Sequence, residues 1–250
     1  MRTYLTLVRR EVNAFFLSLT GYVVIASVLL LLGWSFTDML NRLNLSPTSA
    51  PLTELFYQTV YFWLILLVTA PVITMRSFAH EKFSGTYETL MTAPVSDLQV
   101  VLAKFTGTLL FYLLTWLPLL GCIVVVRYCT GERVLLDPHT AATTFLGILL
   151  IGCLYMSLGC FASAMTRSQI LAAMNSFALG LLLFLVGLPT LVPVPAADWA
   201  GKAKAYISMS EHMGDFVRGV VDTRYVVFYL TLTAFFLFLT LKVVESRRWK

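Results

Sequence analysis

The residues of this chain that could do chemistry gather in one stretch, 76–104, where charged and polar side chains interrupt an otherwise apolar sequence. Their types suit binding to another molecule more than catalysis. The 250 residues contain no G-x-x-x-x-G-K-[ST] phosphate loop, no H-E-x-x-H zinc pair and no G-x-S-x-G nucleophile turn. The three histidines, His80, His139 and His212, lie in separate segments, which favours solvated surface residues over metal ligands. We therefore expect no catalytic, cofactor-binding or metal-binding residues in this chain.

The spacing within this stretch predicts a short helix after Gly85. Thr86 can cap its start and Pro94 ends it. Ser96 and Gln99 then form a capping-box pattern that opens the next long helix. The apolar face of the expected helix consists of Tyr87, Leu90 and Met91, and Glu88 points away from that face.

The composition identifies the elements that must position this segment. Hydrophobic residues make up 58% of the chain, charged residues only 12%, and the mean hydropathy is +0.82, values too apolar for a soluble domain. We expect an all-α polytopic membrane protein with six transmembrane helices. The cores of the six predicted spans are residues 22–37, 55–75, 105–126, 141–165, 170–192 and 225–241.

The distribution of basic residues predicts the orientation. The net charge of +5 comes from residues at the ends of spans, with no basic patch in a soluble region, which argues against nucleic acid. If the N-terminus is cytoplasmic, the inner segments carry 11 of the 18 Lys and Arg residues, in agreement with the positive-inside rule. We therefore expect both termini in the cytoplasm.

The first 20 residues predict an amphipathic helix in the inner headgroup layer, since their apolar residues recur at helical spacing. A signal peptide is the alternative, but the apolar run begins only after Glu11 and ends at Gly33 to Ser35 without a small-x-small cleavage site. The apolar stripe consists of Leu5, Val8, Val12, Phe15, Phe16 and Leu19.

Only residues 166–169 join spans four and five, so the two spans must form an antiparallel hairpin. Small residues along one face of each span predict that the two helices pack closely. Asn175 differs from its neighbours. An amide in the membrane needs a partner, so it either bridges helices, which we favour, or lines a route. The packing residues are Ser157 and Cys160 on span four, with Cys153 and Ala164 on the same face, and Ala172, Asn175, Ser176 and Gly180 on span five.

Between residues 193 and 222 the composition predicts short helices at the outer surface, either interfacial or re-entrant. Ser210 can cap one of them and Asp222 can cap the last span. The expected apolar face of this helix holds Met209, Met213, Phe216, Val217 and Val220, opposite Glu211, Asp215 and Arg218.

No ionisable group lies deep in a predicted span, as an ion-coupled carrier would require. Lys104, about a turn and a half after the cap of span three, can extend its ammonium group to the inner surface. Energy for any transport must therefore come from a partner subunit.

Residues 81–96, EKFSGTYETLMTAPVS, followed by Lys104 and Phe105, resemble the EK-x-x-GT-x-E-x-L-x-x-x-P-V-S signature of ABC-2 type exporter permeases. The C-terminal run from Glu211 through Asp222 to Trp249 resembles the gliding-motility-associated (GldF-like) branch of that family. The six-span hydropathy agrees, so the resemblance covers nearly the whole chain.

The resemblance implies a single transmembrane domain, 1–250, with an N-terminal elbow helix (1–20), a cytoplasmic coupling segment (76–97) and an outer gate segment (193–222). It implies pairing with a second permease subunit, identical or homologous, in the lipid of a bacterial inner membrane, and docking of a cytoplasmic ATP-binding subunit that holds Mg-ATP. The implied coupling residues are Glu81, Lys82, Gly85, Thr86, Tyr87, Glu88, Leu90, Met91 and Pro94, and the implied gate residues are His212, Phe216, Gly219 and Asp222.

Three functions are compatible with these observations to different degrees. The first is an exporter permease driven by a separate ATPase. The second is a membrane anchor that recruits an ATPase for an envelope or motility process without moving a substrate. The third, a membrane-embedded enzyme, is disfavoured by the missing nucleophile and metal motifs.

Overall fold

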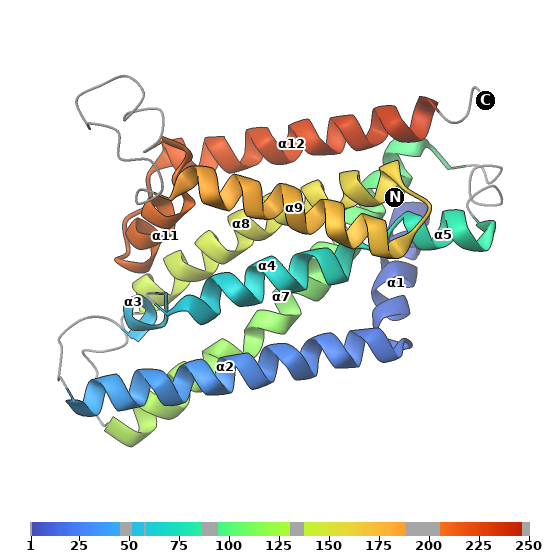
Figure 1. Ribbon diagram of the computed structural model, residues 1–250. Helices are drawn as coiled ribbons and strands as arrows, with labels where there is room; N and C mark the ends of the chain where they lie inside the picture. The colour runs from blue at the N-terminus through green and yellow to red at the C-terminus, as the bar shows by residue number, and fades with distance from the viewer. Residues whose placement is uncertain are drawn as a thin grey trace.

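The fold was analysed in a computed structural model that describes residues 2–45, 52–57, 59–86, 95–130, 138–188 and 206–246. Every regular element in these ranges is an α-helix (Figure 1). In chain order they are α1 (Arg2–Phe16), α2 (Leu19–Leu45), α3 (Leu52–Tyr57), α4 (Val60–Thr74), α5 (Ala79–Ser84), α7 (Asp97–Thr130), α8 (Pro138–Met165), α9 (Gln169–Gly187), α11 (Met209–Val217) and α12 (Thr223–Ser246).

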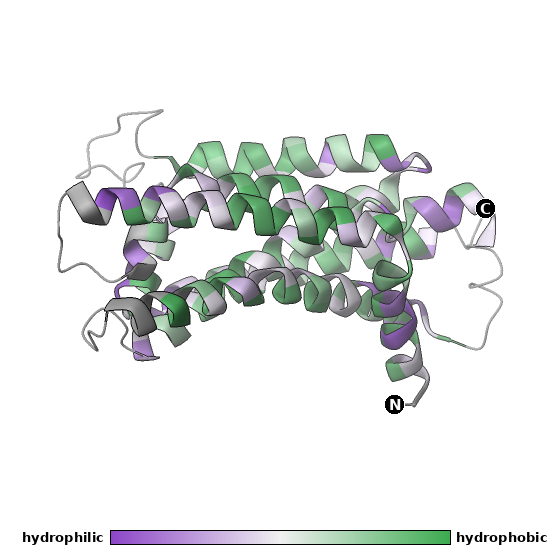
Figure 2. Ribbon diagram, turned by 90° about the horizontal axis from the view of Figure 1, so that it is seen from below, coloured by the Kyte–Doolittle hydropathy of each residue, from purple (hydrophilic) through white to green (hydrophobic). Residues whose placement is uncertain are grey.

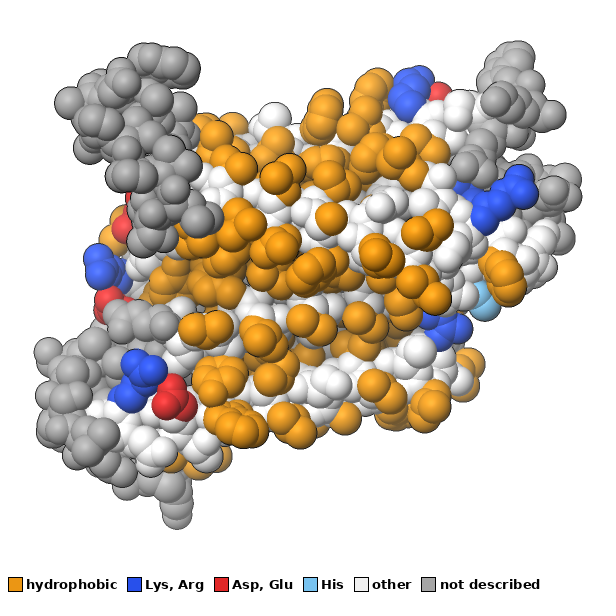
Figure 3. Space-filling view, in the orientation of Figure 1, with side chains coloured by type: hydrophobic (Ala, Val, Ile, Leu, Met, Phe, Trp, Pro, Cys, Tyr) orange, Lys and Arg blue, Asp and Glu red, His pale blue; other side chains and the backbone are white. Residues whose placement is uncertain are grey.

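Six helical segments are long and apolar enough to cross a membrane, which confirms the predicted number of spans. Hydrophobic residues dominate along the long helices, and hydrophilic residues gather near their ends and in α1 and α5 (Figure 2). Hydrophobic side chains cover the middle of the face seen in Figure 3, with charged side chains towards both ends. The six segments are Leu19–Arg42, Val60–Ser84, Asp97–Cys122, Pro138–Met165, Gln169–Gly187 and Thr223–Ser246.

Helix α8 forms the centre of the bundle. It contacts α4, α7, α9, α11 and α12, and residues on every side of its middle turns are buried. Its small residues permit this, because glycine, serine and cysteine side chains let neighbouring helices approach closely. The other long helices each keep one side exposed.

The short helices mark the two ends of the bundle (Figure 1). Helices α1 and α5 lie at one end, together with the C-terminal end of α12, and we call this the α1 end. Helices α3 and α11 lie at the other, the α11 end. The two polar parts of the molecule are therefore separated by the length of the spans.

Two expected boundaries are wrong. The predicted span at residues 55–75 is not one continuous helix, because α3 ends at Tyr57 and α4 begins at Val60, with Thr59 between them in an extended conformation. Thr59 stabilises this break by donating its hydroxyl to the carbonyl of Phe56. The predicted span at 170–192 is shorter, since α9 ends at Gly187 and Leu188 is extended.

The even number of spans predicts the sidedness of any reporter attached to the chain. A fusion after Lys250 should report the cytoplasmic side, and a reporter inserted before Pro138, at the start of α8, should report the opposite side. Alkaline phosphatase and green fluorescent protein fusions measure this, because each is active on only one side of a bacterial inner membrane. Equal sidedness at both positions would contradict the six-span topology.

Candidate functional site

The described part of the predicted coupling segment lies at the α1 end. It contains Glu81, Lys82, Gly85 and Thr86, whereas Tyr87, Glu88, Leu90, Met91 and Pro94 lie outside the described residues. The expected helix after Gly85 falls on those residues as well. The structure instead describes an earlier helix, α5, which the sequence analysis missed and which ends at Gly85 in a left-handed conformation with φ of 74°.

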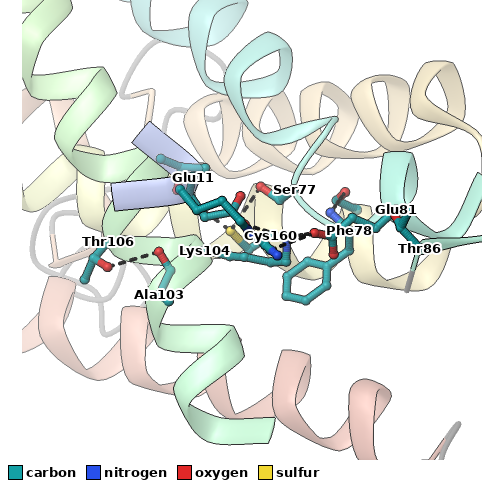
Figure 4. Close-up of polar contacts among 12 residues, drawn as sticks. Glu11, Ser77, Phe78, Glu81, Thr86, Ala103, Lys104, Thr106 and Cys160 are labelled. Carbon is teal, nitrogen blue, oxygen red and sulfur yellow. Dashed lines mark hydrogen bonds and ion pairs between the residues drawn. The ribbon is translucent and has the colours of Figure 1, made fainter. Parts of the chain in front are cut away.

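Charged residues from three elements meet beside α5 (Figure 4). The Nζ atom of Lys104 on α7 lies 2.9 Å from Oε1 of Glu81 on α5 and 3.2 Å from Oε1 of Glu11 on α1. Arg10 completes the group, with Nη2 2.9 Å from Oε1 of Glu11 and 3.1 Å from Oε1 of Glu81. We call Arg10, Glu11, Glu81 and Lys104 the ion-pair cluster. Its formal charges balance.

The position of Lys104 corrects the sequence analysis. Its side chain is only 2% exposed, so the ammonium group does not extend to the surface. The ring of Phe78, 5.3 Å away, adds a cation–π contact. Burial of an ammonium group is unfavourable unless other groups compensate for the lost water, and here two carboxylates do so.

The packing of α1 on α7 brings Glu11 over Lys104. A Cβ atom on Gly107 of α7 would lie 2.7 Å from the Cβ of Glu11, so only glycine permits this approach. One turn further along each helix the rings of Phe15 and Phe111 stack with centroids 4.4 Å apart. Helix α1 covers residues 2–16 of the amphipathic helix predicted at 1–20, but it ends at Phe16. Leu19 of the predicted stripe begins α2, and both Leu5 and Leu19 are exposed.

Helix α5 is also attached to α8 and α9. The hydroxyl of Ser163 on α8 accepts hydrogen bonds from the backbone N–H groups of Phe78 and Ala79 at the start of α5, and donates one to the carbonyl of Met75. The ammonium group of Lys82 donates to the carbonyl of Ala164. His80 pairs with Gln169 of α9 at 2.9 Å. Ser163 was not among the predicted site residues, because a lone serine in an apolar span carries no motif.

These contacts determine how α5 can move. Buried charges hold it to α1 and α7, and a satisfied hydroxyl holds it to α8, so a displacement of α5 must either break these bonds or move the three neighbouring helices. Breaking a buried ion pair leaves an uncompensated charge and is strongly unfavourable. The other carboxylate oxygen of Glu81, Oε2, is buried and has no hydrogen-bond partner in the described structure. The Glu81 carboxylate is therefore compensated through Oε1 alone.

At the α11 end, α11 inserts its apolar face into the bundle. The buried residues include Met209, Met213, Phe216 and Val217, as the spacing predicts, whereas Val220 is exposed beyond the end of the helix. Thr143 of α8 donates a hydrogen bond to the carbonyl of Phe216 at 2.7 Å. Asp222 accepts from the N–H of Arg224, the expected cap of the last span.

Two predictions for this region are wrong. The cap of α11 is Ser208, whose hydroxyl accepts from the N–H of Glu211, and Ser210 lies within the helix. His212, expected to be a solvated surface residue, is fully buried. Its ring stacks on Tyr225 with centroids 4.0 Å apart, and its Nδ1 lies 3.2 Å from the Tyr229 hydroxyl. Of the other gate residues, Gly219 follows the helix with a positive φ of 87°.

Contacts between α3 and α11 hold this end together. Tyr57 donates its hydroxyl to the carbonyl of Ser210, and Arg218 pairs with Glu54 at 3.0 Å. Burial, with a smaller contribution from Glu211, raises the pKa of the Tyr57 hydroxyl well above its ordinary value. Tyr57 therefore keeps the proton that it donates throughout the physiological pH range.

The predicted packing residues divide into two groups. Ser157 and Cys160 on α8, and Ala172, Ser176 and Gly180 on α9, are buried. Tyr155 of α8 donates its hydroxyl to the carbonyl of Gly180 at 3.1 Å. Asn175, in contrast, is exposed and makes no hydrogen bond to another described residue, so it does not bridge helices within this chain.

An apolar groove of about 530 Å³ runs between α4 and α9 near the α11 end. Its side chains are aromatic and aliphatic apart from a threonine and a tyrosine hydroxyl. Within the described ranges no group of three or more His, Cys, Asp and Glu side chains could hold a metal ion. The groove is lined by Tyr57, Thr59, Val60, Trp63, Leu64, Leu67, Val68, Phe177 and Phe184.

The arrangement described so far, six apolar helices with polar elements at both ends, defines a multi-pass helical membrane protein. The family described as ABC-2 family transporter protein matches residues 16–218, well over half of the chain. The chain therefore belongs to the ABC-2 transporter family, whose members are membrane components of ABC transporters. No curated protein shows a significant match to it.

Removing the Lys104 ammonium group tests the ion-pair cluster. In Lys104→Met, Glu11 and Glu81 face each other with Arg10 as the only cation left in the ion-pair cluster. We expect the free energy of unfolding to fall by about 3–5 kcal/mol, which is typical for breaking a buried ion pair. Thermal unfolding in detergent, followed by scanning fluorimetry, would record this as a lower Tm.

Lys242→Met is the matched control, because Lys242 forms an exposed pair with Glu245 on α12. Lys242→Met should lower the free energy of unfolding by about 1 kcal/mol or less. The double variant Lys104→Met with Glu81→Gln restores the charge balance and should lose less stability than Lys104→Met alone. Equal melting of Lys104→Met and Lys242→Met would show that the cluster contributes no stability.

Proposed function

We propose that this chain is the permease subunit of an ATP-driven exporter in a bacterial inner membrane. A separate cytoplasmic cassette subunit binds and hydrolyses Mg-ATP, and this chain converts the motion of that subunit into movement of a substrate across or out of the membrane. The proposal extends the family membership, which implies association with an ATP-binding subunit. The absence of a phosphate loop from the sequence is consistent with it.

The observation that carries the proposal is the attachment of α5 to α1, α7 and α8. A subunit driven from outside needs a surface segment whose displacement is passed to the membrane helices and not absorbed locally. Helix α5 directly precedes residues 87–94, and its contacts include the buried pair Lys104–Glu81 and the two N–H groups held by Ser163. In this mechanism residues 76–97 receive the force, and the ion-pair cluster transmits it.

The finer assignments follow from the same mechanism. Helix α1 is the elbow helix, the α1 end and both termini face the cytoplasm, and α11 belongs to the outer gate segment. Glu81 is engaged with Lys104 and Arg10, so the charge offered to the cassette subunit comes from Glu88. The GldF-like branch remains our expectation for the position of the chain within its family.

The groove between α4 and α9 favours an apolar or amphipathic substrate. Its lining residues offer aromatic and aliphatic surface and no charged side chain. A small hydrated ion would find no compensation for its lost water there. We therefore propose a lipid-linked, amphipathic or peptide substrate.

Reconstitution tests the coupling. The purified chain in proteoliposomes should hydrolyse no ATP, and addition of its cognate cassette subunit should give hydrolysis and ATP-dependent movement of a fluorescent phospholipid analogue. Hydrolysis without movement of this probe or of peptide probes would favour the membrane anchor that recruits an ATPase. Hydrolysis by the chain alone would contradict the proposed division of labour.

Charge reversal at Glu88 tests docking. Glu88→Arg should weaken association with the cassette subunit at least tenfold, because like charges brought together at an interface cost several kcal/mol. Co-purification with the cassette subunit measures the loss. Glu211→Arg, an exposed carboxylate at the α11 end, is the control and should leave association unchanged. If both variants co-purify like the parent, Glu88 has no part in docking.

A further inference from the structure

Arg76 differs from the cations of the ion-pair cluster. It directly follows α4 and its side chain is half-buried, yet it forms no ion pair with any described carboxylate. Its guanidinium group instead contacts a neutral hydroxyl, that of Thr20 at the start of α2, which lies at the α1 end (Figure 1). A partly buried cation is unfavourable without a compensating negative charge. No described residue supplies that charge to Arg76.

A directed chain of hydrogen bonds fixes the guanidinium group. Arg76 donates to Oγ1 of Thr20, which lies 2.9 Å from Oγ of Ser18. The Ser18 hydroxyl donates to the carbonyl of Phe15 at 3.0 Å, so Ser18 must accept from Thr20. The guanidinium group uses one N–H in this chain and keeps its others, in a rigid planar fork, for a further acceptor.

The turn that carries Thr20 is tightly built. The N–H of Gly21 donates to the carbonyl of Ser18 at 3.1 Å and lies 3.3 Å from its hydroxyl. A Cβ atom at position 21 would lie 2.1 Å from the carbonyl oxygen of Phe15, so the close approach of α2 to the end of α1 requires glycine. The hydroxyl that orients Arg76 is therefore held in place by the protein itself.

Apolar side chains project from the same turn. Leu17 and Leu19 are 87% and 80% exposed, and Tyr22 and Val23 in the first turns of α2 are exposed as well. A predicted membrane span begins at Leu19, so these side chains lie where the headgroup layer meets the hydrocarbon layer. A soluble anion would leave this apolar surface in water. A phospholipid suits both features, because it joins a phosphate to acyl chains.

We propose that Arg76 binds the phosphate of an anionic phospholipid of the inner leaflet, whose acyl chains lie against Leu19 and Val23. A guanidinium group can donate two parallel hydrogen bonds to two oxygens of one phosphate. Cationic pockets between transmembrane helices on the cytoplasmic side suit lipids of this kind. The bound lipid would neutralise Arg76 and stabilise the contact between α2 and the segment that connects α4 to α5.

This inference shares one premise with the proposed function, that the α1 end faces the cytoplasm. It goes beyond that function, because this lipid is a resident ligand at the inner surface, whereas the groove proposed for the substrate lies near the α11 end. Its test requires neither ATP nor a cassette subunit. Lipid binding can therefore fail while coupled transport is observed, and the reverse.

Lipid titration of the purified full chain tests the site. Phosphatidylglycerol or phosphatidylcholine is added to the chain in a maltoside detergent, and the lipid concentration that gives half of the maximal rise in Tm is measured by scanning fluorimetry. Phosphatidylglycerol should act on the parent at a lower concentration than phosphatidylcholine. Arg76→Gln should raise the half-maximal concentration of phosphatidylglycerol by about tenfold, since hydrogen bonds to a charged group contribute affinity of that order.

Arg167→Gln is the matched control, because Arg167 is an exposed cation in the turn between α8 and α9 and forms no ion pair with a described residue. It should change the half-maximal concentration by no more than about twofold, since solvent and salt screen an exposed charge. Equal weakening by Arg76→Gln and Arg167→Gln would overturn the proposal, because the lipid would then respond only to the total charge.

Two variants that keep the net charge test the geometry of the site. Arg76→Lys retains a cation but loses the planar fork, and Thr20→Val removes the hydroxyl that orients Arg76. Each should raise the half-maximal concentration of phosphatidylglycerol by about threefold or more. If both variants bind phosphatidylglycerol like the parent, no built site exists.

Inorganic phosphate distinguishes a lipid from a soluble anion. Added to the parent at the same concentrations without lipid, it should leave Tm unchanged, because it makes no use of the apolar surface beside Arg76. A rise in Tm equal to that given by phosphatidylglycerol, and abolished by Arg76→Gln, would assign the site to a soluble phosphate and overturn the lipid proposal.

Discussion

The structure depends most on a single buried cation, the ammonium group of Lys104, and on the two carboxylates that compensate for its lost hydration. Glu11 and Glu81 reach it from α1 and α5, so three elements far apart in the sequence must be in place together before the charge is tolerated. Arg10 then balances the second carboxylate. Because Lys104 needs both carboxylates to compensate for its lost hydration, α5, which carries Glu81, is difficult to move independently of its neighbours.

Helix α8 connects this cluster to the opposite end of the molecule. Ser163 near its C-terminal end holds the start of α5, and Thr143 near its N-terminal end holds the C-terminal end of α11. Between them the helix is surrounded by other spans, and densely packed helices shift as units more readily than they deform. A displacement at α5 therefore has a direct structural route to α11, which is the property expected of a membrane component driven by an external ATPase.

The surface of the bundle is specialised as well. Helix α12 exposes no amide or charged side chain between Arg224 and Lys242, whereas α9 exposes Asn175 and borders the groove next to α4. Burial of Ala172, Ser176 and Gly180 turns Asn175 outwards. One set of small residues thus packs α9 inside the chain and thereby sets which side of α9 is exposed.

The sequence by itself determined the number of spans, the amphipathic helix at the N-terminus, the apolar face of α11 and the cap at Asp222, because hydropathy, helical spacing and capping depend on residues a few positions apart. Only the tertiary structure decided the environments of Lys104, His212 and Asn175. Lys104 lies 93 positions from Glu11, and no local pattern predicts such a pair. His212 is buried by aromatic rings of α12, and Asn175 is exposed because α9 packs on the bundle by the face that carries Ala172, Ser176 and Gly180. Whether a polar group faces solvent, lipid or another side chain is decided by which helices meet, and this depends on the packing of the whole bundle.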